Sequence, residues 1–239
     1  MKWLEREQPD LLALQETKIQ NDEFPADAFA QYGYVAAFSG QSAYNGVAIL
    51  SRAPLDDVAY DIGGGYVDEQ RRVLGATIRG ARLWSLYVPN GQSVDSDKYR
   101  YKLEWLAALR ALLADELARH PHLLVVGDFN VAPDDRDVHN PDAWRGKIMC
   151  SPAERAALTS LCDLGLRDAF RLFPQPEKIF SWWDYRAGAF RRNQGLRIDL
   201  VLASDALSQT CSGCRIDKEP RGWDRPSDHV PVIAEFAFP

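Results

Sequence analysis

The stretch KYRYKLEWLAALRALLADELARHPHLLVVGDFNV, residues 98–131, carries the pattern that decides the fold class. Over residues 98–119, leucines recur at steps of three and four with charged residues opposite, which predicts one long amphipathic helix. Pro121 follows the helix, and the apolar run 123–127 then predicts a buried strand that ends at Asp128. The stretch therefore predicts a helix packed on a core and a carboxylate at the end of a buried strand.

Further short apolar runs predict strands over residues 11–16, 47–51, 72–78, 83–88, 197–203 and 230–238, with a hairpin turn at 79–82. A second helix begins at the N-cap Ser151, with Pro152 and Glu154 in its first turn, and ends by Gly165. Several strands have connections too short for the crossovers of a parallel sheet. We therefore expect an α+β fold in which two β-sheets pack face to face as a sandwich with helices on the outside, a four-layer α/β/β/α arrangement.

Composition leaves the function class open. No repeat, linker or composition break divides the chain, so we expect a single domain over residues 1–239. The net charge of −6 counts only mildly against a nucleic-acid partner, because basic residues cluster locally at 71–72, 98–102 and 191–192. The apolar runs are shorter than the roughly 18 residues of a membrane span, and residues 1–7 are too charged for a secretory signal. We expect a cytoplasmic monomer with no membrane partner.

The four cysteines are Cys150, Cys162, Cys211 and Cys214. The last two form one C-x-x-C, but no second C-x-x-C or nearby histidine completes a zinc site. We interpret all four as reduced structural thiols.

Polar residues stand at the ends of the predicted strands. Glu16, Tyr87, Asp128 and Asn130 lie at or just past strand ends, Asp199 interrupts an apolar strand, and Asp228-His229 precedes the last strand. A carboxylate in an apolar strand is costly unless it is paired or binds a metal. Because strand ends converge on one rim, the sequence predicts a site there.

The chemistry of this set indicates hydrolysis at a phosphate. Carboxylate and amide oxygens favour Mg²⁺, with Mn²⁺ as the alternative, over zinc. His229 is suited to polarise a phosphoryl oxygen or accept a proton from water, while Asp199 holds its other ring nitrogen. Attack of water on a phosphodiester needs such groups together with the charge of the metal.

Seven short blocks, in order along essentially the whole chain, carry a family resemblance: residues 15–18, 45–49, 87–91, 127–133, 181–185, 197–199 and 227–231. They resemble the signature blocks of the exonuclease III and AP-endonuclease family, within the endonuclease/exonuclease/phosphatase superfamily. Residues 137–141, Trp144 and 151–155 resemble the bacterial exonuclease III branch in particular.

The resemblance implies a role for each matching residue. Tyr87 contacts the scissile phosphate, Asp128 activates water or serves the leaving group, Asn130 assists the transition state, and Asp199 pairs with His229. Trp182 shapes a pocket for a baseless sugar. The expected metal ligands are Glu16, Asp128, Asn130, Asp228 and His229.

Three further residues have a structural interpretation beside a functional one. Trp182 is an ordinary core aromatic unless it contacts DNA. Arg71 lies on a solvated charged face or binds a phosphate, and Asn90 is a turn residue or a phosphate contact. His139 is interpreted as a loop histidine outside the site.

The function implied is a DNA-repair hydrolase on double-stranded DNA: a 3′→5′ exonuclease with AP-endonuclease and 3′-phosphatase activity, acting at abasic sites and 3′ ends. Two alternatives stay open. One is a phosphoesterase of the same superfamily with a non-DNA substrate, such as an inositol phosphate or sphingolipid headgroup. The other is an inactive DNA-binding relative.

The resemblance also implies a strand with an Asn-x-Asn block before the position of Met1. We hypothesise that the natural start lies upstream, because the later blocks are intact. Genomic sequence with no in-frame strand upstream of Met1 would contradict this.

Overall fold

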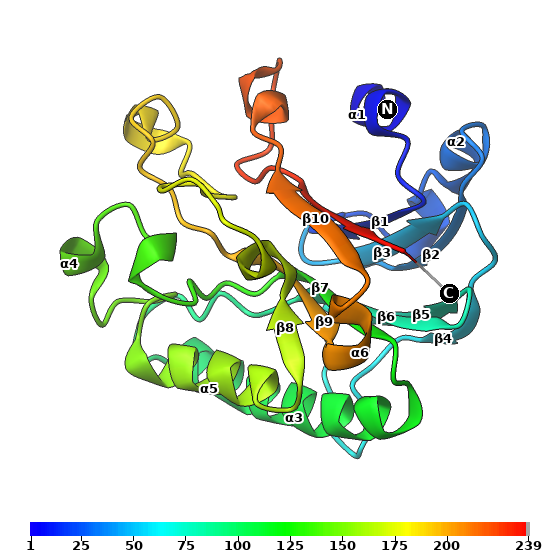
Figure 1. Ribbon diagram of the computed structural model, residues 1–239, viewed down its shortest axis with the longest axis horizontal. Helices are drawn as coiled ribbons and strands as arrows, with labels where there is room; N and C mark the ends of the chain where they lie inside the picture. The colour runs from blue at the N-terminus through cyan, green and yellow to red at the C-terminus, as the bar shows by residue number, and fades with distance from the viewer. Residues whose placement is uncertain (238–239) are drawn as a thin grey trace.

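A six-stranded sheet forms the centre of the computed structural model, which describes residues 1–237 (Figure 1). Strands β6 (Ala81–Tyr87) and β7 (Leu123–Asp128) are parallel, and α3 (Asp97–Arg119) makes the crossover between them. The other neighbours in this sheet are antiparallel. In spatial order, the strands are β4 (Asp56–Ala59), β5 (Val73–Ile78), β6 (Ala81–Tyr87), β7 (Leu123–Asp128), β9 (Asp199–Ser204) and β8 (Leu166–Asp168).

The second β layer consists of two separate sheets. Three antiparallel strands have the order β1 (Leu11–Gln15), β3 (Val47–Ser51) and β2 (Val35–Ser39), and β10 (Cys211–Ile216) pairs with β11 (Val232–Phe236). An apolar core that includes Ile49, Leu74 and Val201 lies between this layer and the six-stranded sheet. The predicted face-to-face sandwich is confirmed, with its second layer divided.

Helices cover both outer faces. The long α3 and α5 (Pro152–Cys162) pack on the six-stranded sheet, where Trp105, Leu109 and Leu161 belong to one buried cluster (Figure 1). On the other side, α1 (Lys2–Glu7) and α2 (Ala26–Ala30) pack on β1, β3 and β2. The predicted four layers are therefore present. The remaining helices are α4 (Pro141–Trp144), α6 (Asp205–Ser208) and the 3-10 turns η1 (Asn21–Glu23), η2 (Asp135–Asp137), η3 (Ala169–Leu172), η4 (Arg186–Gly188) and η5 (Glu219–Gly222).

The predicted ends of helices and strands agree best with the structure where the sequence has a clear cap or turn. Ser151 caps α5 in a reciprocal capping box with Glu154, as predicted, although the helix ends at Cys162 rather than near Gly165. The β5–β6 hairpin turns on two residues, Arg79 and Gly80, both with positive φ, and not on the four expected. The last strand was expected to reach Phe238, which lies outside the described residues.

The prediction that charged residues of α3 face solvent is wrong at two positions. Lys102 and Glu116 are buried on the core side, at 0% and 2% exposure. Glu116 accepts hydrogen bonds from Arg82 and from the Trp84 indole, and Lys102 pairs with Glu154 of α5. Each buried charge has an opposite charge on another element, which leucine spacing alone does not reveal.

All four cysteines are free thiols. Burial raises the pKa of the Cys150 and Cys162 thiols to about 11 and that of Cys214 to about 12. These thiols therefore stay protonated at neutral pH, as structural cysteines do. Within residues 1–237, the helices are too short or too polar to cross a membrane.

Candidate active site

Backbone register brings three of the predicted site residues side by side. In the six-stranded sheet Tyr87 pairs with Asp128, and Asp128 pairs with Asp199, so the three residues occupy one end of neighbouring strands β6, β7 and β9. The hydroxyl of Ser181 accepts hydrogen bonds from the backbone N–H groups of Ile198 and Asp199, which fixes the start of β9.

Glu16 reaches the same place from the other β layer. It directly follows β1 and has a left-handed φ of 53°, and the next two backbone N–H groups donate to the carbonyls of Gly46 and Asn45. The Tyr87 hydroxyl donates to Glu16 Oε1 at 2.6 Å. The site is therefore built across the interface of the two β layers.

Asn130 folds back onto Asp128. Its φ of 49° lies in the left-handed region, and its backbone N–H donates to Asp128 Oδ1 at 2.8 Å while its side-chain Nδ2 donates to Oδ2 at 2.9 Å. Burial raises the pKa of Asp128 to about 7; the charge of His229 opposes the rise, and that of Asp199 adds to it. At neutral pH this carboxyl is able both to accept and to release a proton.

His229 lies between two aspartates. Its Nδ1 is 2.9 Å from Asp199 Oδ2, and its Nε2 is 3.9 Å from Asp128 Oδ2. Backbone pairing of Trp182 with His229 holds this position. Burial lowers the pKa of His229, but the carboxylates of Asp199 and Asp128 raise it more, to about 10 overall.

A divalent metal ion fits one group of these side chains. Glu16, Asp128 and His229 each offer a ligand atom, and these atoms lie within 4.8 Å of one another. Two carboxylates leave positions for water and phosphate oxygens, as Mg²⁺ requires. Asp228 is not in this group: its Oδ2 accepts a hydrogen bond from the Trp182 indole at 2.9 Å.

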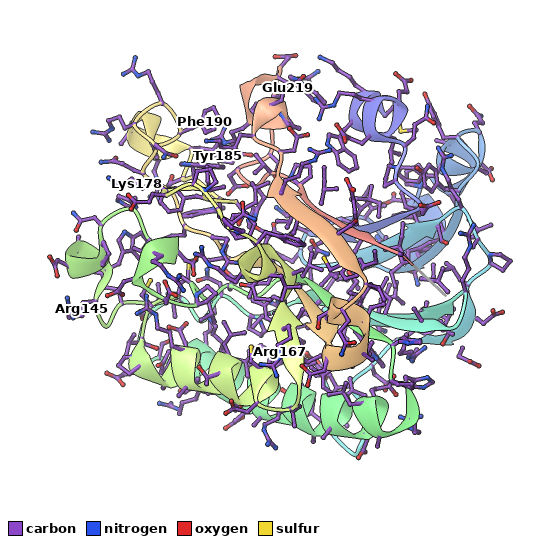
Figure 2. The ribbon with its side chains drawn as sticks, in the orientation of Figure 1. Arg145, Arg167, Lys178, Tyr185, Phe190 and Glu219 are labelled. Atoms are coloured by element: carbon purple, nitrogen blue, oxygen red, sulfur yellow. The ribbon has the colours of Figure 1, made fainter. Side chains whose placement is uncertain are left out.

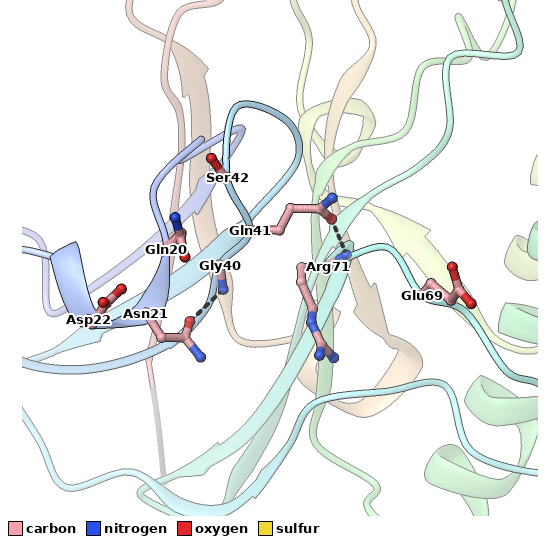
Figure 3. Close-up of a pocket in the computed structure, with 8 residues that line it drawn as sticks. All are labelled: Gln20, Asn21, Asp22, Gly40, Gln41, Ser42, Glu69 and Arg71. Atoms are coloured by element: carbon pink, nitrogen blue, oxygen red, sulfur yellow. Dashed lines mark hydrogen bonds between the residues drawn. The ribbon is translucent and has the colours of Figure 1, made fainter.

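The three predicted DNA contacts lie in different surroundings. Asn90 belongs to the site, since its Nδ2 donates to Asn130 Oδ1 at 3.0 Å. Trp182 is half-buried beside Asp228, whereas Trp183 is a fully buried core residue. Arg71 is exposed at a separate hollow of about 570 Å³ (Figure 3), lined also by Gln20, Asn21, Asp22, Gly40, Gln41, Ser42 and Glu69.

A family model described as the Endonuclease/Exonuclease/phosphatase family matches residues 1–229. The chain belongs to this family.

Relatives and solved structures agree with that membership. The chain is 34% identical over 245 residues to exodeoxyribonuclease III of Haemophilus influenzae, covering 98% of this chain and 92% of the relative. It superposes with a TM-score of 0.97 and 43% identity on a Neisseria 3′ phosphatase bound to a product DNA hairpin, over 99% of this chain and 92% of that one. An AP endonuclease from Archaeoglobus fulgidus matches with a TM-score of 0.94 and 38% identity, over 99% and 92%. The predicted exonuclease III and AP-endonuclease resemblance is confirmed.

Sequence reasoning missed how this family member supports Tyr87. Arg72 is buried, its guanidinium lies 4.8 Å from the centre of the Tyr87 ring, and its Nη1 donates to the Tyr87 carbonyl. In the sequence, Arg72 stands with Arg71 in a basic cluster. The start of the apolar strand directly after it was the available signal.

We predict that His229 is an imidazolium throughout the neutral pH range in the metal-free protein. Asp199→Asn removes the nearest carboxylate, so the pKa of His229 should fall by about 1 to 3 pH units. NMR titration of the His229 ring with EDTA present, assigned with His229→Gln, measures both values. A raised histidine pKa stabilises the fold fully below about pH 6.5, and this contribution is lost as pH rises through about 10. A wild-type ring that titrates near 6.5 would contradict the prediction.

Proposed function

We propose that the chain is a metal-dependent DNA-repair nuclease that hydrolyses phosphodiester bonds of double-stranded DNA. The observation that carries the proposal is the placement of Glu16, Tyr87, Asp128, Asp199 and His229 on one rim, drawn from both β layers. The relatives named for exodeoxyribonuclease III, 3′ phosphatase and AP endonuclease support DNA as the substrate. The proposed activities are 3′→5′ exonuclease, AP endonuclease and 3′-phosphatase, at 3′ ends and abasic sites.

The proton chemistry is assigned to two residues. Asp128 takes a proton from the attacking water or gives one to the leaving oxygen, and burial raises the pKa of its carboxyl in the metal-free protein. His229, kept charged by Asp199, donates a hydrogen bond to a phosphoryl oxygen on which negative charge develops.

Tyr87 and Asn130 serve as fixed donors. Burial, together with the hydrogen bond to Glu16, raises the pKa of Tyr87, so its hydroxyl keeps its proton. This O–H donates to Glu16 in the free protein, and we assign it to the scissile phosphate once DNA and metal are bound. Asn130 donates its backbone N–H to Asp128 Oδ1 and its two side-chain N–H groups to Asp128 Oδ2 and the Val88 carbonyl, so we assign it to hold Asp128 in place in the transition state.

The metal proposed is Mg²⁺, with Mn²⁺ as a substitute. Glu16 and Asp128 would hold it, and Asn130 and Asp228 remain proposed ligands. His229 would be a ligand only as a neutral imidazole through Nε2, which excludes its role as the charged donor, and we assign it as the donor. A bound divalent cation supplies charge stabilisation at the phosphoryl oxygens. A cytoplasmic location and a monomeric state stay predictions.

The test is cleavage of end-labelled duplex DNA that carries one abasic-site analogue. We predict cleavage at the analogue or from the 3′ end with Mg²⁺, and none with EDTA. Asp128→Asn should reduce the rate by at least about 100-fold, because it removes the proton-transferring carboxyl.

The matched control is Asp205→Asn, which should leave the rate unchanged. Asp205 follows the far end of β9, about 20 Å along the strand from Asp199, and pairs with the exposed Arg167 (Figure 2). If the folded wild-type protein is inactive on DNA but cleaves a lipid or inositol phosphoester, DNA is not its substrate and that phosphoester takes its place.

Arg71 is proposed as a contact to a DNA phosphate outside the catalytic rim. Arg71→Ala should raise KM for duplex DNA, and the slope of log KM against log salt should fall by about one, since one phosphate contact is lost. The control is Arg110→Ala, at an exposed position of α3, which removes the same charge. It should change neither KM for duplex DNA nor the salt slope. Equal salt slopes for wild type and Arg71→Ala would exclude the contact.

A further inference from the structure

Lys102 is a fully buried cation close to the candidate active site. Its side chain has 0% exposure. Its Nζ donates to the backbone carbonyl of Asn130 at 2.7 Å, to that of Asn90 at 3.2 Å, and to Glu154 Oε1. An ammonium group has three N–H donors, so these acceptors use its full capacity.

Glu154 is enclosed just as completely. Its side chain also has 0% exposure. Besides Lys102, Oε1 accepts from the backbone N–H of Met149 at 3.0 Å, and Oε2 accepts from the N–H and the hydroxyl of Ser151 at 3.0 and 2.7 Å. The pair therefore connects α3 to the first turn of α5.

A contribution to stability does not by itself explain why Lys102 and Glu154 are buried as an ion pair. Taking both charges out of water costs more than their attraction commonly returns, and well-packed apolar residues often stabilise a core equally well. Its geometry suggests what it does instead. Both carbonyls that Lys102 holds belong to asparagines of the rim, on the loops that follow β6 and β7.

These two asparagines lead directly to Asp128. Asn90 Nδ2 donates to Asn130 Oδ1, and Asn130 Nδ2 donates to Asp128 Oδ2. Asn130 has a left-handed φ of 49°, a region in which asparagine is enriched among non-glycine residues. The Lys102 ammonium on its carbonyl fixes this backbone in place.

We propose that the buried Lys102–Glu154 pair is a positioning device that holds the Asn90 and Asn130 backbones so that Asn130 stays aligned on Asp128. The inference rests on the proposed nuclease function, whose chemical step it serves. Lys102 and Glu154 touch neither substrate nor metal in this account and act only through the two asparagines.

A second buried ion pair on the same helix provides the control. Glu116 of α3 pairs with Arg82, at 3% and 6% side-chain exposure. Their other partners include the Trp84 indole, the Asp57 carbonyl and Arg119, none of which belongs to the rim. Removing this pair changes stability without changing the alignment of Asn130.

The experiment compares two double variants in steady-state cleavage of the abasic duplex. Lys102→Met with Glu154→Gln removes the positioning pair and leaves no buried charge, and Arg82→Met with Glu116→Gln does the same for the control pair. Because a misplacement of about 1 Å can cost about 100-fold in rate, we expect kcat of the first variant to fall at least tenfold, with KM within about twofold of wild type. The control should keep both constants, whatever its melting temperature.

A second variant, Lys102→Gln with Glu154→Gln, keeps polar groups at both positions without a buried charge and covers failure of the first double variant to fold. The amide at position 102 can still donate to position 154 but has two N–H groups instead of three, so one rim carbonyl loses its donor. We expect kcat to fall at least about threefold. A kcat within twofold of wild type in either folded variant, or an equal loss of kcat in the control, would overturn the proposal. An inactive wild type would instead contradict the nuclease function itself.

Discussion

The register of three neighbouring strands is the constraint on which the rest of the site depends. Tyr87, Asp128 and Asp199 are adjacent because β6, β7 and β9 pair in one fixed alignment. A slip by one residue would turn the buried apolar side chains of these strands to the wrong face, so the core enforces the alignment. Packing between the two β layers then brings Glu16 to the hydroxyl of Tyr87. The same burial that stabilises the fold thus sets the spacing of the reacting groups.

Carboxylates that lie close together on one rim repel one another, and a histidine placed between two of them reduces this repulsion. Asp199 and Asp128 flank one histidine, whose positive charge compensates both. Asp128 is the more deeply buried of the two, at 3% exposure, and this burial raises its pKa to about 7. Behind the rim, Lys102 and Glu154 fix the loops from which Asn90 and Asn130 project. Groups that react and groups that hold them therefore form two connected layers of polar contacts.

Much of this could be predicted from the sequence, and the failures have physical causes. Helix α3 is predictable because its apolar pattern is long, and β3 because its short run is apolar at almost every position and follows the turn residues Asn45 and Gly46. The rim residues are predictable because polar groups at the ends of apolar strands are conspicuous. Strand β8 has three residues and β4 has an irregular register, so neither leaves a periodic pattern. Burial of Lys102 was missed because its partner Glu154 is 52 residues away. The assignment of individual roles came from the resemblance of the blocks and not from periodicity.

The most direct test of the account is a titration of the DNA-free protein with Mn²⁺. Binding is measured by the loss of the electron paramagnetic resonance signal of the free ion. The account predicts a site that weakens at least about tenfold in Glu16→Gln, because one of the clustered carboxylates is lost. Asp205→Asn, at the opposite end of β9, should bind as the wild type does. Unchanged binding in Glu16→Gln would show that the rim shared by the two β layers is not the metal site, and the central claim would fail.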